Sequence, residues 1–132
     1  MQGAMAFQKG LGCVHSLSHS LGGVDPRLHH GTLNAMFLPA VVQFNAASES
    51  MQKEKRLERM ARAMGLASGS DIADALRDMN ARLQLPAGLS AMGVQSQSFE
   101  KIIQGALADH CHLSNPRLAS VADYTNLLEE SM

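Results

Sequence analysis

Residues 12–39, GCVHSLSHSLGGVDPRLHHGTLNAMFLP, decide how the rest of the chain is interpreted, because they hold four of its six histidines among small and apolar residues. His15 and His19 are four residues apart. On a helix their imidazoles therefore lie on one face, with Cβ atoms about 5–6 Å apart. The following loop contains Gly-Gly and Asp-Pro, which end a helix and turn the chain back. His29 and His30 come after this loop, so a second element can return an imidazole toward the first pair.

Spacing alone predicts a metal site made of His15, His19 and one imidazole from beyond the loop. Neutral imidazoles suit a divalent transition metal such as iron or zinc. A histidine pair at helical spacing is also typical of buried side chains that bond to backbone or hydroxyl groups, because histidine is a common but not a diagnostic metal ligand. The residues by themselves leave both interpretations open.

Length and composition limit the classes of protein to consider. The 132 residues suffice for one domain, 1–132, with a single core. A formal net charge of −1 offers no basic surface for nucleic acid or for an anionic membrane, so we expect neither partner. Cys13 and Cys111 form no CxxC pair, which is typical of reduced thiols. With no signal peptide and no apolar run long enough to span a bilayer, we expect a cytoplasmic protein.

The hydrophobic pattern predicts an all-α fold, a bundle of about five to seven helices, because no strand alternation appears. Nine methionines and few aromatic residues predict a core filled by flexible side chains. Periodicity predicts helices over these segments: from about Ala4 to Gly22, from Thr32 to about Ala47, over 51–64, from Ile72 to near Pro86, from Phe99 to about 110–112, and after Ser120.

Capping signals refine these boundaries. The first helix has no capping residue before Ala4, whereas Thr32 can cap the second, which Pro39 should kink. Gly65 is the expected C-cap of the charged third helix. The expected capping boxes are Ser68 with Asp71 and Ser120 with Asp123.

The arrangement as a whole resembles the metal-binding segment of the iron-containing (group III) alcohol dehydrogenases. In that family a helix with Gly-x-x-His-x-x-x-His precedes Leu-Gly, a short loop, a His-Gly pair and a buried Asn-Ala-x-x-Leu-Pro helix. The matching residues are Gly12, His15, His19, Leu21-Gly22, His30-Gly31 and Asn34-Ala35-Met36-Phe37-Leu38-Pro39. Asn115-Pro116-Arg117 also resembles the family's turn before the last helix, so the match runs nearly end to end.

This resemblance implies one divalent iron, sometimes replaced by zinc, bound by an aspartate and three histidines. Two of those ligands belong to a helix upstream of the matching segment, and the other two map onto His15 and His30. His19 maps onto a histidine that lies near the nicotinamide and the substrate oxygen, so its implied role is catalytic. His29 stands where the family often has proline and competes with His30, although Gly31 favours His30 by permitting a tight backbone.

The implied activity is reversible hydride transfer between a primary alcohol or aldehyde and NAD(P), with the metal as Lewis acid. The sequence shows no glycine-rich turn after a strand, so we expect the C-terminal part of a larger, truncated two-domain enzyme that lacks its nucleotide-binding domain. Such a part should be inactive alone and should form homo-oligomers through uncovered apolar surface. One alternative is a stand-alone helical metal-binding or interaction module using His15, His19 and His30. Another is a structural domain in which the histidines are merely packed.

Residues near the second cysteine are not expected to carry chemistry. His110 and His112 flank Cys111, but positions two apart on a helix point to different faces, which argues against a second metal site there. Asp109 is expected to be a cap and Arg117 a member of a surface pair.

Overall fold

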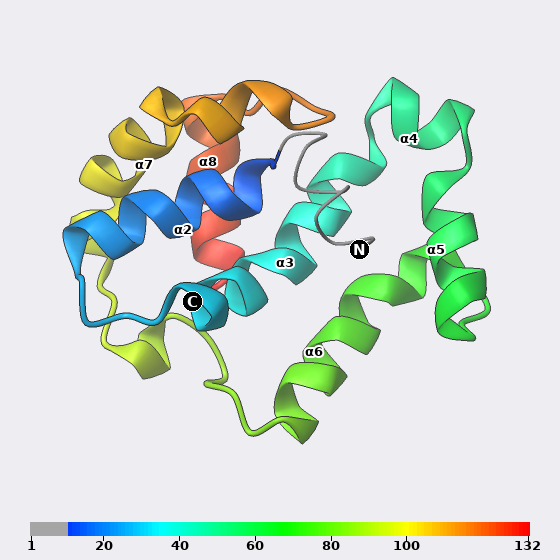
Figure 1. The fold of residues 1–132 in the computed structure, drawn as a ribbon, viewed down its shortest axis with the longest axis horizontal. Helices are drawn as coiled ribbons and strands as arrows, with labels where there is room; N and C mark the ends of the chain where they lie inside the picture. The colour runs from blue at the N-terminus through cyan, green and yellow to red at the C-terminus, as the bar shows by residue number, and fades with distance from the viewer. Residues whose placement is uncertain (1–10) are drawn as a thin grey trace, which may run out of the picture.

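The computed structural model describes residues 11–132, and in that range the chain contains helices and no β-strand (Figure 1). Its seven α-helices confirm the expected all-α class. They are α2 (Cys13–Val24), α3 (His30–Ala46), α4 (Glu49–Lys53), α5 (Arg56–Met64), α6 (Ile72–Arg82), α7 (Phe99–Ala108) and α8 (Val121–Glu130). Short 3-10 turns are η1 (Gly69–Asp71), η2 (Ser90–Met92), η3 (Ser96–Ser98) and η4 (His110–Ser114).

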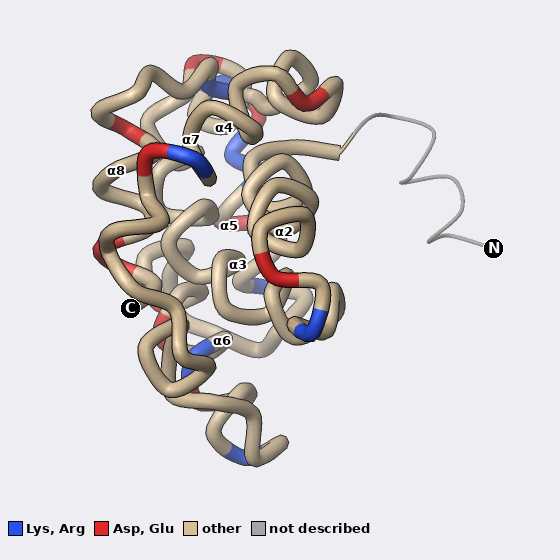
Figure 2. The backbone as a smooth tube through the Cα atoms, turned by 90° about the vertical axis from the view of Figure 1, so that its left-hand side faces the viewer, with Lys and Arg blue, Asp and Glu red and all other residues tan. Residues whose placement is uncertain are grey.

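Helix α3 crosses the middle of the molecule, with α2, α7 and α8 on one side and α4, α5 and α6 on the other (Figure 1). Neither α2 nor α3 contains Asp, Glu, Lys or Arg, as the tan tube along both helices shows (Figure 2). Helices with so few charged side chains bury most of their apolar surface against other elements. The 17-residue α3 is the element around which the others pack.

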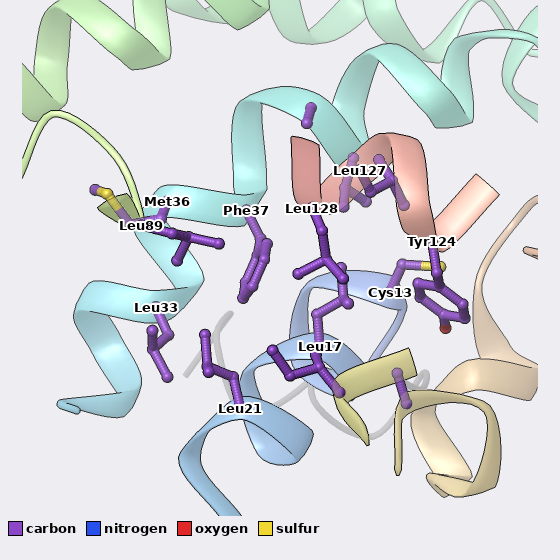
Figure 3. Close-up of a cluster of buried hydrophobic side chains, with 14 of the residues drawn as sticks. Cys13, Leu17, Leu21, Leu33, Met36, Phe37, Leu89, Tyr124, Leu127 and Leu128 are labelled. Atoms are coloured by element: carbon purple, nitrogen blue, oxygen red, sulfur yellow. The ribbon is translucent and has the colours of Figure 1, made fainter. Parts of the chain in front are cut away.

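The core lies between α2, α3, α7 and α8, and Figure 3 shows side chains of α2, α3 and α8 converging on it. Phe37, Leu17 and Leu128 are completely buried there. Each such side chain contributes about 1.5–3 kcal/mol by leaving water. The core also contains Cys13, Leu21, Leu33, Met36, Ala40, Val41, Leu89, Val94, Ile102, Ile103, Ala106, Ala119, Tyr124 and Leu127.

Residues 49–82, which we call the outer arm, contain α4, α5, η1 and α6 and contribute no member to that core. The apolar side chains buried within the arm are Ala61, Ile72 and Ala73. Met60 and Met64 of α5 are 41% and 37% exposed. Among the described methionines only Met36 is buried, so the expectation of a methionine-filled core is wrong, because leucine and isoleucine fill that space.

The first predicted helix starts elsewhere than expected. Its predicted start at Ala4 lies outside the described residues, but α2 begins at Cys13, and Gly12 before it is extended, with φ −128°. The prediction of one continuous helix through Gly12 is therefore wrong. The cause is a long-range contact: Asn115 Oδ1 accepts the Cys13 N–H at 3.1 Å. A Cβ at Gly12 would collide with that same oxygen, so glycine is needed at this position.

Two other boundaries differ from the predictions. Helix α3 begins at His30 with His29 as its N-cap, so the expected cap at Thr32 is wrong, while Pro39 stays inside the helix. The charged segment forms α4 and α5 instead of one helix, because Lys55 between them has left-handed backbone with φ 48°.

The remaining capping predictions are confirmed. Gly65 ends α5 in left-handed conformation with φ 73°. Capping boxes form at Ser68 and at Ser120, where each serine side chain accepts a backbone N–H and an aspartate three residues later bonds back. In the described part of the chain, no helix combines the length and apolar character needed to cross a bilayer.

Candidate metal centre

Helices α2 and α3 bring three of the predicted histidines together. His15 and His19 lie one turn apart on α2, and His30 is the first residue of α3. The ring centroids of His15 and His30 are 5.4 Å apart, and those of His19 and His30 are 5.2 Å apart. The connecting loop is held by Asp25, whose carboxylate accepts the Arg27 backbone N–H and pairs with its guanidinium at 2.7 Å. The tight loop therefore places the start of α3 beside the exposed face of α2.

A single amide connects His15 and His30. The Asn34 Nδ2 amide lies 3.1 Å from His30 Nε2 and 3.5 Å from His15 Nε2, so it donates a hydrogen bond toward both rings. Both Nε2 atoms therefore face one point in space. His29 is instead the exposed N-cap, and its ring lies against Gly31, where an added Cβ would stand 3.1 Å from His29 Cε1. The structure thus groups His30, and not His29, with His15.

The protonation state of His15 suits a metal ligand. Burial lowers the pKa of the His15 imidazole, and the neighbouring His30 and His19 lower it further. A neutral imidazole keeps the lone pair that a divalent metal needs. The Asn34 Oδ1 atom is buried without a hydrogen-bond partner. Buried polar atoms normally have a partner, so this site contains a polar group that the protein itself leaves unsatisfied. The residues present therefore fit a divalent ion held by imidazoles.

His19 has a different partner. Its Nδ1 lies 3.0 Å from Asp109 Oδ2, and the side chains of His19 and Asp109 are 36% and 15% exposed. Asp109 Oδ1 also accepts the Cys111 N–H at 2.8 Å, which confirms the predicted cap. Burial raises the pKa of the Asp109 carboxyl, but the hydrogen bonds from Cys111 and His19 outweigh it and hold that pKa below its ordinary value. Asp109 thus stays ionised and orients the His19 ring.

Sequence reasoning missed both Asn34 and Asp109 as members of this site. Local spacing could have identified Asn34. It follows His30 by four residues, and residues four apart on a helix lie on one face. Asp109 carried no such signal, since it is 90 residues from His19 in the chain.

Of the other candidate residues, His110 lies beside this cluster, with its ring centroid 6.2 Å from that of His19, whereas His112 and Arg117 bond elsewhere. His112 is buried and its Nδ1 lies 2.9 Å from the Tyr124 hydroxyl, whereas the His110 side chain is 84% exposed. The two rings point to different surroundings, as their spacing predicts. Arg117 pairs with Asp123 at 3.2 Å, which confirms the expected surface pair.

Comparison with known proteins identifies a family and several dehydrogenase relatives. A family model described as "Fe-containing alcohol dehydrogenase family, C-terminal" matches residues 1–132. Over 136 residues the chain is 60% identical to a 4-hydroxybutyrate dehydrogenase of Cupriavidus necator, covering 100% of this chain and 36% of that protein. It is 32% identical to an NAD-dependent methanol dehydrogenase of Bacillus methanolicus, covering 100% of this chain and 35% of the relative. The chain therefore spans about a third of the length of these curated relatives.

Solved structures share the fold. An alcohol dehydrogenase from Oenococcus oeni matches with a TM-score of 0.81 and 27% identity, over 92% of this chain and 33% of that one. A 1,3-propanediol oxidoreductase matches with a TM-score of 0.80, also at 27% identity, over 92% of this chain and 33% of that one. The helical fold of this chain therefore also occurs in these two solved oxidoreductases.

Proposed function

The chain belongs to the iron-containing alcohol dehydrogenase family, and from this premise we propose that residues 1–132 form one helical domain that carries the metal-site histidines of an NAD(P)-linked alcohol or aldehyde oxidoreductase. The observation that carries the proposal is the shared contact of His15 Nε2 and His30 Nε2 with Asn34, beside His19. His15 and His30 are the proposed ligands of a divalent iron or zinc. His19 is the proposed catalytic residue.

In this proposal the chain's own residues handle a proton. When bound, the ion would supply Lewis acidity that makes the alcohol hydroxyl a stronger acid, and the nicotinamide would supply the hydride acceptor. His19 Nδ1 is occupied by Asp109, which leaves Nε2 to accept the hydroxyl proton. The Asp109 carboxylate stabilises the imidazolium that results.

The substrate proposal follows from the relatives. The C. necator relative is named for 4-hydroxybutyrate, so we propose a primary alcohol of that class for the complete enzyme. In this proposal two further metal ligands and the nucleotide-binding domain lie outside the matching segment, as the family resemblance implies. We therefore expect the purified 132-residue chain to be inactive with 4-hydroxybutyrate and NAD. Measurable NADH formation by this chain would overturn that expectation.

His30→Ala with His29→Ala as matched control tests the ligand assignment. The two residues are neighbours, and both are exposed, so the variants differ chiefly in which imidazole is lost. We expect His30→Ala to weaken iron(II) binding by about tenfold or more, measured by anaerobic equilibrium dialysis, and His29→Ala to leave it unchanged. The reverse pattern, or equal affinity in all three proteins, would exclude His30 as the ligand.

The second candidate function is a stand-alone metal-binding module in which His15, His19 and His30 share the ion. It is favoured by one observation, the 5.2–5.8 Å separations of the three ring centroids. His19→Gln separates the two candidates in the same iron(II) measurement. The dehydrogenase proposal expects the affinity to stay within about twofold, whereas the module expects a loss as large as that of His30→Ala.

We also propose that this chain self-associates. Leu83, Leu118 and Leu113 are 62%, 63% and 78% exposed, so the surface contains large apolar side chains that burial would stabilise. Multi-angle light scattering should report a species larger than the monomer mass. A monomer at all concentrations tested would contradict this proposal.

A further inference from the structure

Beside the histidine pair, donors of three chemical types meet at the junction of α2, α7 and η4. They are an imidazole nitrogen of His19, a carboxylate oxygen of Asp109 and the sulfur of Cys111, and these atoms all lie within 4.8 Å of one another. Among the described residues, this is the one group of three potential metal-binding side chains that approaches so closely.

The backbone around these donors is already fixed. The Asp109 Oδ1 bond to the Cys111 N–H, at 2.8 Å, ties the carboxylate to the thiol, and leaves Oδ2 directed at His19. Helix α2 packs against α7, so His19 is held opposite this turn by the core below it. His19 thus comes from a packed helix, and Asp109 and Cys111 from a turn that their own hydrogen bond closes, which limits their movement as a metal site requires.

The three donor atoms, all within 4.8 Å of one another, lie close to the separations that a tetrahedral ion requires. Donors bound at about 2.0–2.3 Å stand roughly 3.2–3.8 Å apart. His19 Nδ1 and Asp109 Oδ2 are 3.0 Å apart, so only small side-chain shifts separate this pair from a coordinated geometry. His110 Nε2 lies 3.4 Å from the Cys111 sulfur, and its exposed ring is placed to reach the remaining coordination position.

We propose that His19, Asp109 and Cys111 form a second transition-metal site, selective for zinc-class ions and separate from the His15 and His30 pair. A mixed nitrogen, oxygen and sulfur set suits zinc, and the thiolate favours it over harder cations. The proposed site does not use His110 and His112 together, because the His112 ring bonds to Tyr124 inside the core.

Binding here exchanges a proton for the metal. Burial raises the pKa of the Cys111 thiol to about 11, so the sulfur carries its proton when no metal is bound. The metal–sulfur bond forms as that proton leaves to solvent, without any change of oxidation state. If the proposed role of His19 is correct, an ion here also removes His19 and Asp109 from proton transfer, so zinc inhibits the complete enzyme.

Cobalt(II) titration of the reduced 132-residue chain tests the site, because a cobalt–thiolate bond gives a near-ultraviolet charge-transfer band that imidazole and carboxylate ligands do not give. We expect this band in the wild-type chain and its loss in Cys111→Ala. Cys13→Ala is the matched control, since it removes the other buried cysteine and should keep the band. Asp109→Asn, which keeps the size of the side chain, should weaken cobalt binding by about tenfold or more.

The outcomes separate this proposal from the proposed function. His30→Ala should keep the charge-transfer band, because His30 is not a ligand of the second site. Absence of the band in the wild-type chain, or its persistence in Cys111→Ala with native circular dichroism, would overturn the second site alone. Loss of iron(II) binding in His30→Ala is a separate result and would still support the first site.

Discussion

The outer arm and the helices α2, α3, α7 and α8 are built from similar helical signals but are stabilised differently. The four helices share one continuous core, with Phe37 and Leu17 fully buried between them. The arm buries mainly Ala61, Ile72 and Ala73, and its other surfaces are charged or expose methionine. Since burial of apolar area is the main source of stability, the two regions should differ in how readily they open.

This difference places the histidine cluster on the better-packed region. His15 and His19 stand on α2, whose opposite face is fixed by Leu17 and Leu21, and His30 starts α3. Ligand sites on packed helices keep their geometry more accurately than sites on weakly anchored segments. The arm contributes no residue to either proposed site, so local opening of the arm should leave metal binding intact.

Truncation of the central phenylalanine should give the largest contrast between the two regions. Phe37→Ala should lower the free energy of unfolding by about 3–5 kcal/mol, because it leaves a cavity in a fully packed core. Met60→Ala, at a side chain 41% exposed on the arm, should change it by less than about 0.5 kcal/mol. Urea denaturation followed by circular dichroism measures both, and equal effects would show that Met60 on the arm is packed as tightly as Phe37 in the core.

The two capping boxes offer the same motif in both regions. Ser120→Ala in α8 should lower the global free energy of unfolding by about 1 kcal/mol. Ser68→Ala removes the equivalent cap in the arm, and should chiefly accelerate amide hydrogen exchange in α5 and α6. Urea denaturation and hydrogen exchange by mass spectrometry distinguish these effects. A loss of global stability in Ser68→Ala as large as in Ser120→Ala would contradict the separation.

The smallest expected effect is a pH dependence at Asp123. Hydrogen bonds from the Ser120 backbone and hydroxyl hold the pKa of Asp123 below its ordinary value, and Arg117 lowers it further. The folded state therefore gains stability above the unfolded-state pKa of about 3.9, and this gain is lost as pH falls through the lowered folded-state value. Asp123→Asn should cost under about 1 kcal/mol at pH 6, and progressively less below pH 4. A penalty that stays constant with pH would show that the charge is not responsible.

Local signals predicted much of the fold because they act over a few residues. The boxes at Ser68 and Ser120 and the glycine at Gly65 each involve hydrogen bonds within one turn, and all three occur where the sequence predicts them. The prediction at Thr32 was wrong because α3 begins two residues earlier, at His30, with His29 in the N-cap position. Local pattern also did not show that the charged segment divides at Lys55.

The sequence also predicted only some of the contacts in the candidate site. Helical spacing placed His15 and His19 on one face, and the loop before His30 indicated the return of another imidazole. Spacing did not distinguish His29 from His30, because neighbouring residues on a helix point in different directions and the starting residue decides which one faces α2. That start depends on how the loop packs.

The sequence by itself determined the all-α class, most of the helical segments, the caps at Gly65, Ser68 and Ser120 and the family to which the histidine pattern belongs, because these depend on residues a few positions apart. Tertiary structure alone decided that α2 begins at Cys13 under Asn115, that Asp109 meets His19, and that Cys111 joins them. Those contacts join segments 90 or more residues apart, and they form only when the apolar faces of α2, α3 and α7 pack into one core.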